Sequence, residues 1–456
     1  MGDFIEPRLR DKKPLNLLRG WPHPSLLPTP AISIASQRVL SDPSISIPGL
    51  LYGPDPGYQP LREEIAKWLS GFYGGQADAE RICVTGGASQ NLACVLQVYS
   101  DPLFTKVWMV APSYFLACRI FDDAGLVTRA VGEGDEGVDL EALEARLREA
   151  ERDEGVEKIK LAKPWSKIYR HIIYCVPTFS NPSGKTMSLS CRQKLVKLAR
   201  KYDALIITDD VYDFLLWPTS SSSSTSSTTA LMPRLVDVDR TMEPVPSADS
   251  FGNAMSNGSF SKIAGPGLRT GWTDATPTFT YGLSQCGSSR SGGAPSQLTA
   301  TMICQLLKSG DIGKHIENVS IPAYKKRYEI MMKAIKQFLI PVGVKVGEVS
   351  FGEKEIFGGY FIWIELPKPM SAEVVCSTAK ERESLIVAPG RLFEVSGDHS
   401  VKFETSLRLC FAWEEVEDLE DGVRRLGKVI KEMGEGKSIP SKHAGKEIKN
   451  DLGAFR

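Results

Sequence analysis

The sequence has 456 residues with 55 basic and 55 acidic side chains, so its formal net charge is zero. This length is about three times the ~150 residues used as a single-domain average, which predicts two or three globular units. Without a basic excess, a nucleic-acid or membrane-surface protein is disfavoured. The 42% hydrophobic and 24% charged residues are typical of a soluble globular protein.

Residues 1–50 are rich in Pro and Ser, which predicts an extended arm lying along another surface. The N-terminus has no apolar region of a secretion signal, and no apolar run in the sequence reaches membrane-spanning length. The nine cysteines are scattered through apolar runs without a CxxC spacing, and the five histidines lie far apart. We therefore expect reduced thiols, no metal site and a cytoplasmic location.

From residue 51, amphipathic helices alternate with short apolar runs. Helices are predicted at 60–69 and 89–99, and strands at 81–85, 106–111, 171–177 and 204–208. Apolar strands between helices are typical of βαβ units, in which helices cover both faces of a parallel sheet. We expect an α/β fold with a mostly parallel sheet over residues 51–310.

Two stretches interrupt this pattern. Residues 133–160 are rich in charge around a few leucines, which predicts an exposed helix with a solvated face. Residues 218–230 form a Ser/Thr tract that lacks the apolar surface needed for ordering, so we expect a disordered surface loop.

A long helical pattern covers 311–339 and contains Pro322, where a bend or break is expected. Apolar runs at 359–366, 384–390 and 406–413 then alternate with helical segments, which predicts a smaller α+β domain. The predicted division is an arm at 1–50 that joins the small domain, a large domain at 51–310 and a linking helix with the small domain at 311–456. The last twenty or so residues are polar and basic, and fraying is expected.

The most informative segment is SFSKIAGPGLRTGW, residues 259–272. Its Lys262 has three interpretations: a solvated loop residue, a phosphate clamp, or an amine that forms a Schiff base with a carbonyl cofactor. A Walker phosphate loop is excluded because the GxxxxGK[ST] pattern is absent from the sequence.

Three more segments follow predicted strands. TFSNPSGKTMS (178–188) carries Asn181, TDDVYDF (208–214) carries Asp209 and Tyr212, and TGGASQ (85–90) opens a helix. Open α/β sheets bind ligands where their strands end, and the N-terminus of a helix binds anions. Singly, each segment is also explained as a turn or a helix cap.

Together, in this order, these segments resemble the fold-type I pyridoxal-5′-phosphate (PLP) enzymes, specifically the class I/II aminotransferase family. The resemblance runs from NLLRGWPHPSLLP through YGPDPGYQPLREEIA and APSYF to SLRLCFAW, nearly the whole chain. It implies an aspartate aminotransferase-like fold, with a seven-stranded type of sheet in the large domain. The subgroup it resembles is the aromatic or 2-aminoadipate type.

The resemblance implies a role for each matching residue around the cofactor ring. Lys262 matches the lysine that binds PLP covalently and moves protons, and Asp209 matches the partner of the pyridine nitrogen. Asn181 and Tyr212 match hydrogen-bond donors to the phenolic oxygen. Tyr114 matches the aromatic residue that stacks on the ring, although a core aromatic explains it nearly as well.

The resemblance also implies the binding groups for two anions. Arg408 matches the arginine that binds the substrate carboxylate, and Gly20 matches the turn that closes over the substrate. Tyr52 matches a tyrosine that reaches the phosphate of the neighbouring subunit, which implies a homodimer with shared active sites. The cofactor phosphate would be bound by Gly87, Ala88, Ser89, Ser259, Ser261 and Arg269. The Ala88-Ser89 pair departs from relatives with two polar side chains at these positions.

The function implied is transfer of an amino group from an amino acid, aromatic, 2-aminoadipate or similar, to a 2-oxo acid such as 2-oxoglutarate. The alternative is a PLP-dependent lyase, decarboxylase or carbon–carbon bond-forming enzyme of the same fold. A regulator with a fused DNA-binding domain is unexpected, because residues 1–50 show no helix-turn-helix pattern.

Overall fold

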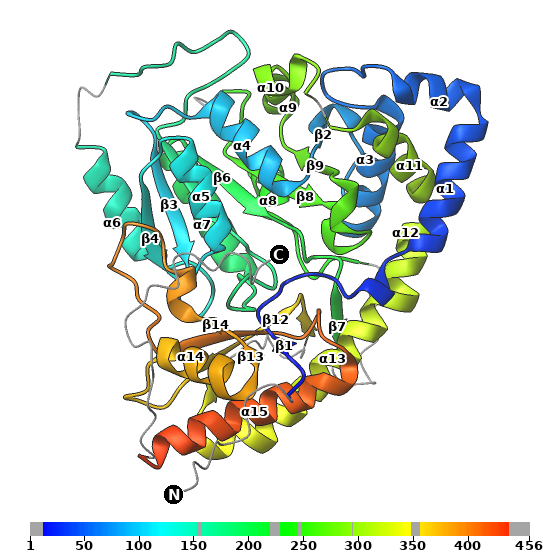
Figure 1. The fold of residues 1–456 in the computed structure, drawn as a ribbon. Helices are drawn as coiled ribbons and strands as arrows, with labels where there is room; N and C mark the ends of the chain where they lie inside the picture. The colour runs from blue at the N-terminus through cyan, green and yellow to red at the C-terminus, as the bar shows by residue number, and fades with distance from the viewer. Residues whose placement is uncertain are drawn as a thin grey trace, which may run out of the picture.

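The computed structural model describes residues 12–152, 157–218, 229–244, 249–293, 295–347 and 356–436. Its largest element is a seven-stranded sheet with the order β2-β9-β8-β6-β5-β3-β4 (Figure 1). The strands are β2 Ile82–Thr85, β3 Lys106–Ala111, β4 Thr128–Gly132, β5 His171–Cys175, β6 Ala204–Asp209, β8 Ala254–Ser259 and β9 Gly271–Asp274. The four strands predicted from apolar runs are β2, β3, β5 and β6, and all four are confirmed.

Neighbouring strands of this sheet are parallel except at β9, which is antiparallel to both β8 and β2. Every residue of β5 and β6 is buried. Side chains along β5 alternate between two buried clusters, with Ile172 and Tyr174 in one and Ile173 and Cys175 in the other. The expected α/β fold with a mostly parallel seven-stranded sheet is confirmed.

Helices cover both faces of the sheet, as expected for parallel strands buried on both sides. One face packs against α4 (Ala88–Tyr99), α5 (Phe115–Asp123) and α9 (Pro277–Ser284). The other face packs against α6 (Leu140–Ala150), α7 (Leu189–Lys201) and α8 (Leu235–Thr241). The helix predicted within 133–160 is α6, which buries Leu143 and Leu147 and exposes its charged side chains.

The prediction of an extended arm over residues 1–50 is wrong for its second half. Residues 29–50 form α1 (Thr29–Ser41) and α2 (Pro43–Leu50), which pack with α3 (Gln59–Tyr73) and α11 (Gln297–Lys308). Pro30 and Pro43 lie at the first positions of these helices, where proline is tolerated because no backbone donor is needed there. Proline content alone therefore gave the wrong structure for this stretch.

The helix predicted over 311–339 is continuous but changes its winding. It consists of α12 (Asp311–His315), a π-helical turn (Ile316–Ser320), α13 (Ile321–Ala334) and a second π-helical turn (Ile335–Leu339). Pro322 is the second residue after the first π-helical turn. The wider turn is consistent with the steric conflict between a proline ring and the preceding helical carbonyl.

A second sheet of four strands has the order β10-β12-β15-β14. Its strands are β10 Lys345–Val346, β12 Phe361–Glu365, β14 Ala388–Pro389 and β15 Ser406–Cys410. Helices α13, α14 (Ala372–Glu383) and α15 (Val416–Gly434) pack together beside it. Two short pairs complete the strands: β1 (Leu15–Asn16) is parallel to β13 (Leu385–Ile386), and β7 (Leu216–Pro218) is antiparallel to β11 (Ile356–Gly358).

The short helical elements are η2 Pro24–Leu26, η3 Ala79–Arg81, η4 Phe260–Lys262, η5 Pro266–Leu268, α10 Gly287–Arg290, η8 Ile340–Val342 and η9 Gly390–Phe393. Within the part of the chain that is described, no helix is long and apolar enough to cross a bilayer. Residues 219–228 of the Ser/Thr tract and the C-terminal residues 437–456 lie outside the described residues. The predictions for these two segments stay predictions.

Candidate active site

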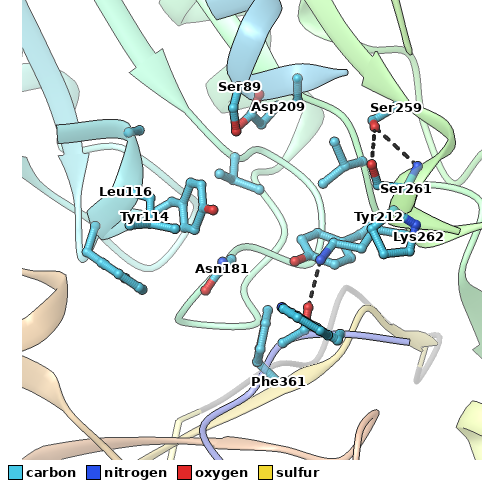
Figure 2. Close-up of a pocket in the computed structure, with 18 of the residues that line it drawn as sticks. Ser89, Tyr114, Leu116, Asn181, Asp209, Tyr212, Ser259, Ser261, Lys262 and Phe361 are labelled. Carbon is cyan, nitrogen blue, oxygen red and sulfur yellow. Dashed lines mark hydrogen bonds between the residues drawn. The ribbon is translucent and has the colours of Figure 1, made fainter. Parts of the chain in front are cut away.

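A cavity of about 240 Å³ lies at the edge where the central parallel strands end. Its wall includes Tyr114, which follows β3, Asn181, which follows β5, and Asp209 and Ser259, the last residues of β6 and β8. The carboxyl ends of parallel strands meet at one edge of a sheet, so segments far apart in sequence converge here. Figure 2 shows Lys262 and Tyr212 on one side, Tyr114 and Leu116 on the other, and Asn181 between them.

Lys262 lies at the end of η4, directly after β8. Its Nζ donates a hydrogen bond to the carbonyl oxygen of Gly20 at 2.7 Å, the dashed line at Lys262 in Figure 2. Burial lowers the pKa of the Lys262 amine to about 8, and the positive charge of Arg408 acts in the same direction. The hydroxyl of Tyr360 donates to the carbonyl oxygen of Lys262 at 3.0 Å and holds its backbone. A buried amine with this pKa is a usable nucleophile near neutral pH.

Asp209 is buried at the end of β6 and accepts two hydrogen bonds. The hydroxyl of Tyr174 donates to Oδ2 at 2.5 Å, and Nδ2 of Asn257 donates to Oδ1 at 2.7 Å. Burial raises the pKa of Asp209 to about 6, while these two donors oppose that rise. The carboxylate is therefore positioned and charged above this pH, ready for a cationic partner.

Arg408, on β15, is buried beside Asn181. Its Nη1 donates to Oδ1 of Asn181 at 2.6 Å, and its Nη2 donates to the carbonyl oxygen of Leu18 at 2.5 Å. The guanidinium lies 4.0 Å from the ring centroid of Phe361 and 4.7 Å from that of Phe393. Among the described residues, none accepts a hydrogen bond from its buried Nε. This cation still has donor capacity for an anion in the cavity.

A second group of donors in the cavity wall, the cradle, lies around Arg269 and includes Ser259 and Ser261. Arg269 has a left-handed backbone with φ of 48°, and its Nη2 donates to the carbonyl oxygen of Gly86 at 2.9 Å. Gly87 has φ of 94°, which favours glycine, and a Cβ there would lie 2.8 Å from Nη2 of Arg269 and displace the guanidinium. The hydroxyl of Ser259 donates to Oγ of Ser261 at 2.9 Å on the same side.

The structure brings together twelve of the fourteen residues predicted for the site. The cavity wall contains Gly20, Ala88, Ser89, Tyr114, Asn181, Asp209, Tyr212, Ser259, Ser261, Lys262, Arg269 and Arg408. Gly87 lies behind the wall, against Arg269. Tyr52 is 90% exposed and packs beside Gly292, so it does not line the cavity of its own chain.

Four residues that support Asp209, Lys262 and Arg408 were not predicted from the sequence: Tyr174, Asn257, Tyr360 and Phe361. Tyr174, Asn257 and Phe361 lie within predicted or observed strands, where polar and aromatic residues look like ordinary core. For Asn257 the available signal was the polar run Ser-Asn-Gly-Ser in a central strand, and for Tyr174 it was a single hydroxyl in an otherwise apolar run. Such a residue needs a buried partner, and that partner is known only from the fold.

Comparison with known proteins supports one family. The sequence model described as aminotransferase class I and II matches residues 37–426. An uncharacterized protein of Saccharomyces cerevisiae is 34% identical, over 92% of this chain and 97% of that protein. Aromatic-amino-acid aminotransferase 1 of Thermococcus litoralis is 28% identical, over 92% of this chain and 88% of that protein.

Among solved structures, this chain is similar to LysN, an alpha-aminoadipate aminotransferase of Thermus thermophilus solved with N-(5′-phosphopyridoxyl)-L-leucine. The TM-score is 0.72 at 28% identity, covering 92% of this chain and 93% of that chain. The fold and site thus define a fold-type I enzyme that depends on PLP. The chain belongs to the class I and II aminotransferase family and is a transaminase. The lyase, decarboxylase or carbon–carbon bond-forming alternative is not favoured.

The residues of the cavity fit PLP. The cofactor needs an amine, an anion for its ring nitrogen and a cradle for its phosphate. The buried Lys262 amine, the Asp209 carboxylate and the Arg269 cradle, which a Cβ at Gly87 would fill, supply these three. The buried Oγ1 of Thr85, next to the cradle, also has no hydrogen-bond partner within the described part of the chain.

Proposed function

We propose that the protein transfers the amino group of an aromatic amino acid, 2-aminoadipate or a similar amino acid to a 2-oxo acid such as 2-oxoglutarate. The observation that carries this proposal is that the Lys262 amine and the Arg408 guanidinium line one cavity. An amino acid and a 2-oxo acid both carry a carboxylate beside the reacting carbon. One arginine can therefore orient both substrates in turn.

Lys262 is proposed as the covalent anchor of the cofactor and as the general base. When bound, PLP supplies an electron-withdrawing ring that accepts the electron pair left when the substrate Cα loses its proton. The Nζ of Lys262, once freed by the substrate amine, would take that proton from Cα. Its pKa of about 8 supports this role, because a general base works best with a pKa near the operating pH.

Four other residues are proposed to hold the ring. Asp209 would pair with the ring nitrogen, and the hydrogen bonds from Tyr174 and Asn257 support an anionic carboxylate there. Asn181 and Tyr212 would donate to the phenolic oxygen, and Tyr114 would stack on the ring. All of these except Asn257 line the cavity.

The phosphate is proposed to bind at the cradle around Arg269. A guanidinium pairs with a phosphate through two parallel hydrogen bonds, and the hydroxyls of Ser259 and Ser261 add donors beside it. The first turn of α4, with Gly87, Ala88 and Ser89, adds free backbone N–H groups and the positive end of the helix. This backbone contribution offsets the missing second hydroxyl at Ala88.

Arg408 is proposed to bind the substrate carboxylate, with Gly20 closing over it. The part of the cavity proposed to hold the substrate side chain is lined by apolar groups from α5 and by Trp21, which supports a substrate with an apolar or aromatic side chain. Besides Lys262, Arg269 and Arg408, Arg19 is the fourth cation of the wall and, with Arg408, the second that we propose for substrate carboxylates. Its Cζ lies 4.9 Å from the ring centroid of Trp21 and 4.7 Å from that of Trp413. A second cation supports binding of dicarboxylates such as 2-aminoadipate and 2-oxoglutarate.

A homodimer with shared active sites is part of the proposal. Tyr52 is 90% exposed, and the neighbouring Ile47, Leu50 and Leu51 are 58%, 67% and 63% exposed. A run of exposed apolar side chains supports an interface, across which Tyr52 would reach the phosphate of the neighbouring subunit. The nine buried cysteines, none in a disulfide, support a reducing compartment, and we propose the cytoplasm.

The ranges 51–310 and 311–456 of the two predicted domains are retained as a proposal, whereas residues 29–50 pack against α11 of the larger one. Most cofactor-facing residues lie within 51–310, whereas Arg408 belongs to the portion from residue 311 onward. The segment before residue 29, which includes Gly20, joins the smaller portion through the pairing of β1 with β13.

The test begins with covalent attachment of the cofactor. Protein loaded with PLP is reduced with borohydride, and peptide mass spectrometry is expected to find the cofactor mass on Lys262. Lys262→Ala should lack that mass and also the visible absorbance recorded before reduction, while the exposed control Lys314→Ala should keep both. Phenylalanine, tyrosine and 2-aminoadipate are then each mixed with 2-oxoglutarate, and glutamate is measured. Release of ammonia or CO₂ without glutamate would contradict the proposed reaction.

A further inference from the structure

Asp209 is tied to the first turn of α4 by one side chain, that of Asn257. Asn257 lies in β8 directly opposite Asp209 in the register of β6 and β8. Its Nδ2 donates to Oδ1 of Asp209 at 2.7 Å and to the carbonyl oxygen of Ala88 at 3.0 Å. Both partners accept hydrogen bonds and donate none when Asp209 is ionised, so the amide nitrogen must face them.

A second asparagine fixes the orientation of this amide. Nδ2 of Asn91, on α4, donates to Oδ1 of Asn257 at 2.8 Å and to Oγ1 of Thr273 at 2.7 Å. Asn91 is 1% exposed and Asn257 is 0% exposed. Burying an amide is costly unless it is hydrogen-bonded, and an apolar pair would fill this space without that cost. We explain the two buried amides by the hydrogen bonds that Asn257 directs to Asp209 and Ala88, with Asn91 holding Asn257 in that orientation.

Resting on the role proposed for Asp209, we propose that Asn257 is a positioning residue that fixes the Asp209 carboxylate relative to the first turn of α4. It thereby fixes the distance between the site proposed for the ring nitrogen and the site proposed for the phosphate. Asn257 is not part of the cavity wall, so it acts through Asp209 and α4. In the view of Figure 2, Asp209 and Ser89 both appear at the top of the cavity.

The charge of Asp209 depends on the same contact. Burial raises its pKa to about 6, and the donors Tyr174 and Asn257 and the positive charge of Lys262 oppose the rise, whereas Asp210 adds to it. Tyr114 also faces Asp209 across the cavity. Removal of the Asn257 donor should raise this pKa further and leave less of the carboxylate charged at neutral pH.

The test is a double-mutant cycle on the PLP-loaded protein. Asn257→Ala is compared with Asn253→Ala, a buried asparagine just before β8 whose Nδ2 donates to the carbonyl oxygen of Ala204 at 2.9 Å. Both changes are made in the wild-type and Asp209→Asn backgrounds. The readouts are the PLP dissociation constant, the absorbance of the bound cofactor from pH 5 to 9, and the Tm.

Asn257→Ala is expected to weaken PLP binding about tenfold in the wild-type background, the usual loss for a hydrogen bond to a charged group. In this variant, the midpoint of the pH-dependent change in the absorbance of the bound cofactor should move by about one pH unit. In the Asp209→Asn background both effects should nearly vanish, and Asn253→Ala should lower the Tm without either effect. Asn91→Leu should shift the same readouts in the same direction by less, and it serves if Asn257→Ala does not fold.

Two outcomes separate the inference from the proposed function. Equal losses from Asn257→Ala, or from Asn91→Leu where that variant is used, in both backgrounds would make the asparagine merely structural and overturn the inference. If Asp209→Asn alone leaves cofactor binding and absorbance unchanged, the role of Asp209 in the proposed function fails instead.

Discussion

The Nζ of Lys262 donates a hydrogen bond to the carbonyl oxygen of Gly20, 2.7 Å away and 242 residues earlier in the chain. Two residues before Gly20, the carbonyl oxygen of Leu18 accepts from Nη2 of Arg408 at 2.5 Å. The pairing of β1 with β13 anchors this segment. One short stretch of main chain thus contacts two of the cations that the proposed reaction uses, Lys262 and Arg408.

Gly20→Ala is expected to raise the KM for the amino donor about tenfold with a smaller change in kcat. A Cβ at Gly20 would lie 2.8 Å from Cζ of Phe361, whose ring lies against the Arg408 guanidinium, so the ring or the segment must shift. Steady-state kinetics check this. Gly71→Ala, on the exposed side of α3 with no atom near its Cβ, should leave KM unchanged. An unchanged KM in Gly20→Ala would show that this contact does not position the arginine.

Covalent attachment of PLP to the apoprotein should speed up with pH and level off above about 8. The reason is that the neutral amine is the nucleophile and burial lowers the pKa of Lys262 to about 8. Stopped-flow absorbance after mixing with PLP measures the rate, and Nα-acetyl-lysine in solution provides the reference. If the protein rate keeps rising to pH 10, as for an ordinary lysine, the amine is not buried in solution.

Asp209→Asn should stabilise the apoprotein at pH 7 by about 1–3 kcal/mol, as the shift of the Asp209 pKa from 3.8 to about 6 implies. Because the folded state binds the proton more tightly than the unfolded state, stability falls as pH rises between these two values. Urea unfolding at pH 4 and pH 7 measures this gap, the difference in unfolding free energy between Asp209→Asn and the wild type, which should nearly vanish at pH 4. The exposed control Asp135→Asn should show no such gap. An equal gap at both pH values would contradict the buried-charge explanation.

Arg19→Ala should discriminate between substrates by their charge. Loss of the cation is expected to raise the KM for 2-oxoglutarate and 2-aminoadipate about tenfold, as for removal of one charge-assisted contact. The KM for phenylalanine should change less than about twofold. Single-turnover half-reactions with each substrate separate these effects, and the exposed Arg391→Ala serves as the control. A uniform loss across substrates would point to a general role of the segment.

Mixing Tyr52→Ala with Lys262→Ala should restore about a quarter of the wild-type activity after subunit exchange. In a homodimer with shared sites, half of the dimers are mixed, and each mixed dimer has one intact site. Mixing Lys262→Ala with Asp209→Asn should restore nothing, because both residues belong to the same chain's cavity. Failure of the first mixture under proven exchange would place Tyr52 outside the neighbouring site.

Four of the seven strands of the central sheet could be predicted because they are continuous apolar runs, and twelve residues of the cavity wall could be predicted because their motifs resemble those of the aminotransferase family. Three features depended on the tertiary structure. Residues 29–50 form two helices that pack against α11, and their proline content did not indicate this. The partners of Asp209 come from β5 and β8, and no local pattern links them. The hydrogen bond from Lys262 to Gly20 requires knowledge of how the first segment crosses the cavity.

The contacts of Leu18 and Gly20 with the two cations are made by main-chain carbonyl oxygens. A substitution at position 18 or 19 leaves these oxygens in the chain, whereas insertion or deletion of one residue between Asn16 and Gly20 would move one of them out of reach. This segment is therefore constrained in length more than in composition. Arg19, between the two contacts, contributes a side chain to the cavity wall. Position 19 is thus where substrate preference can diverge during evolution while the main-chain hydrogen bonds to Lys262 and Arg408 are kept.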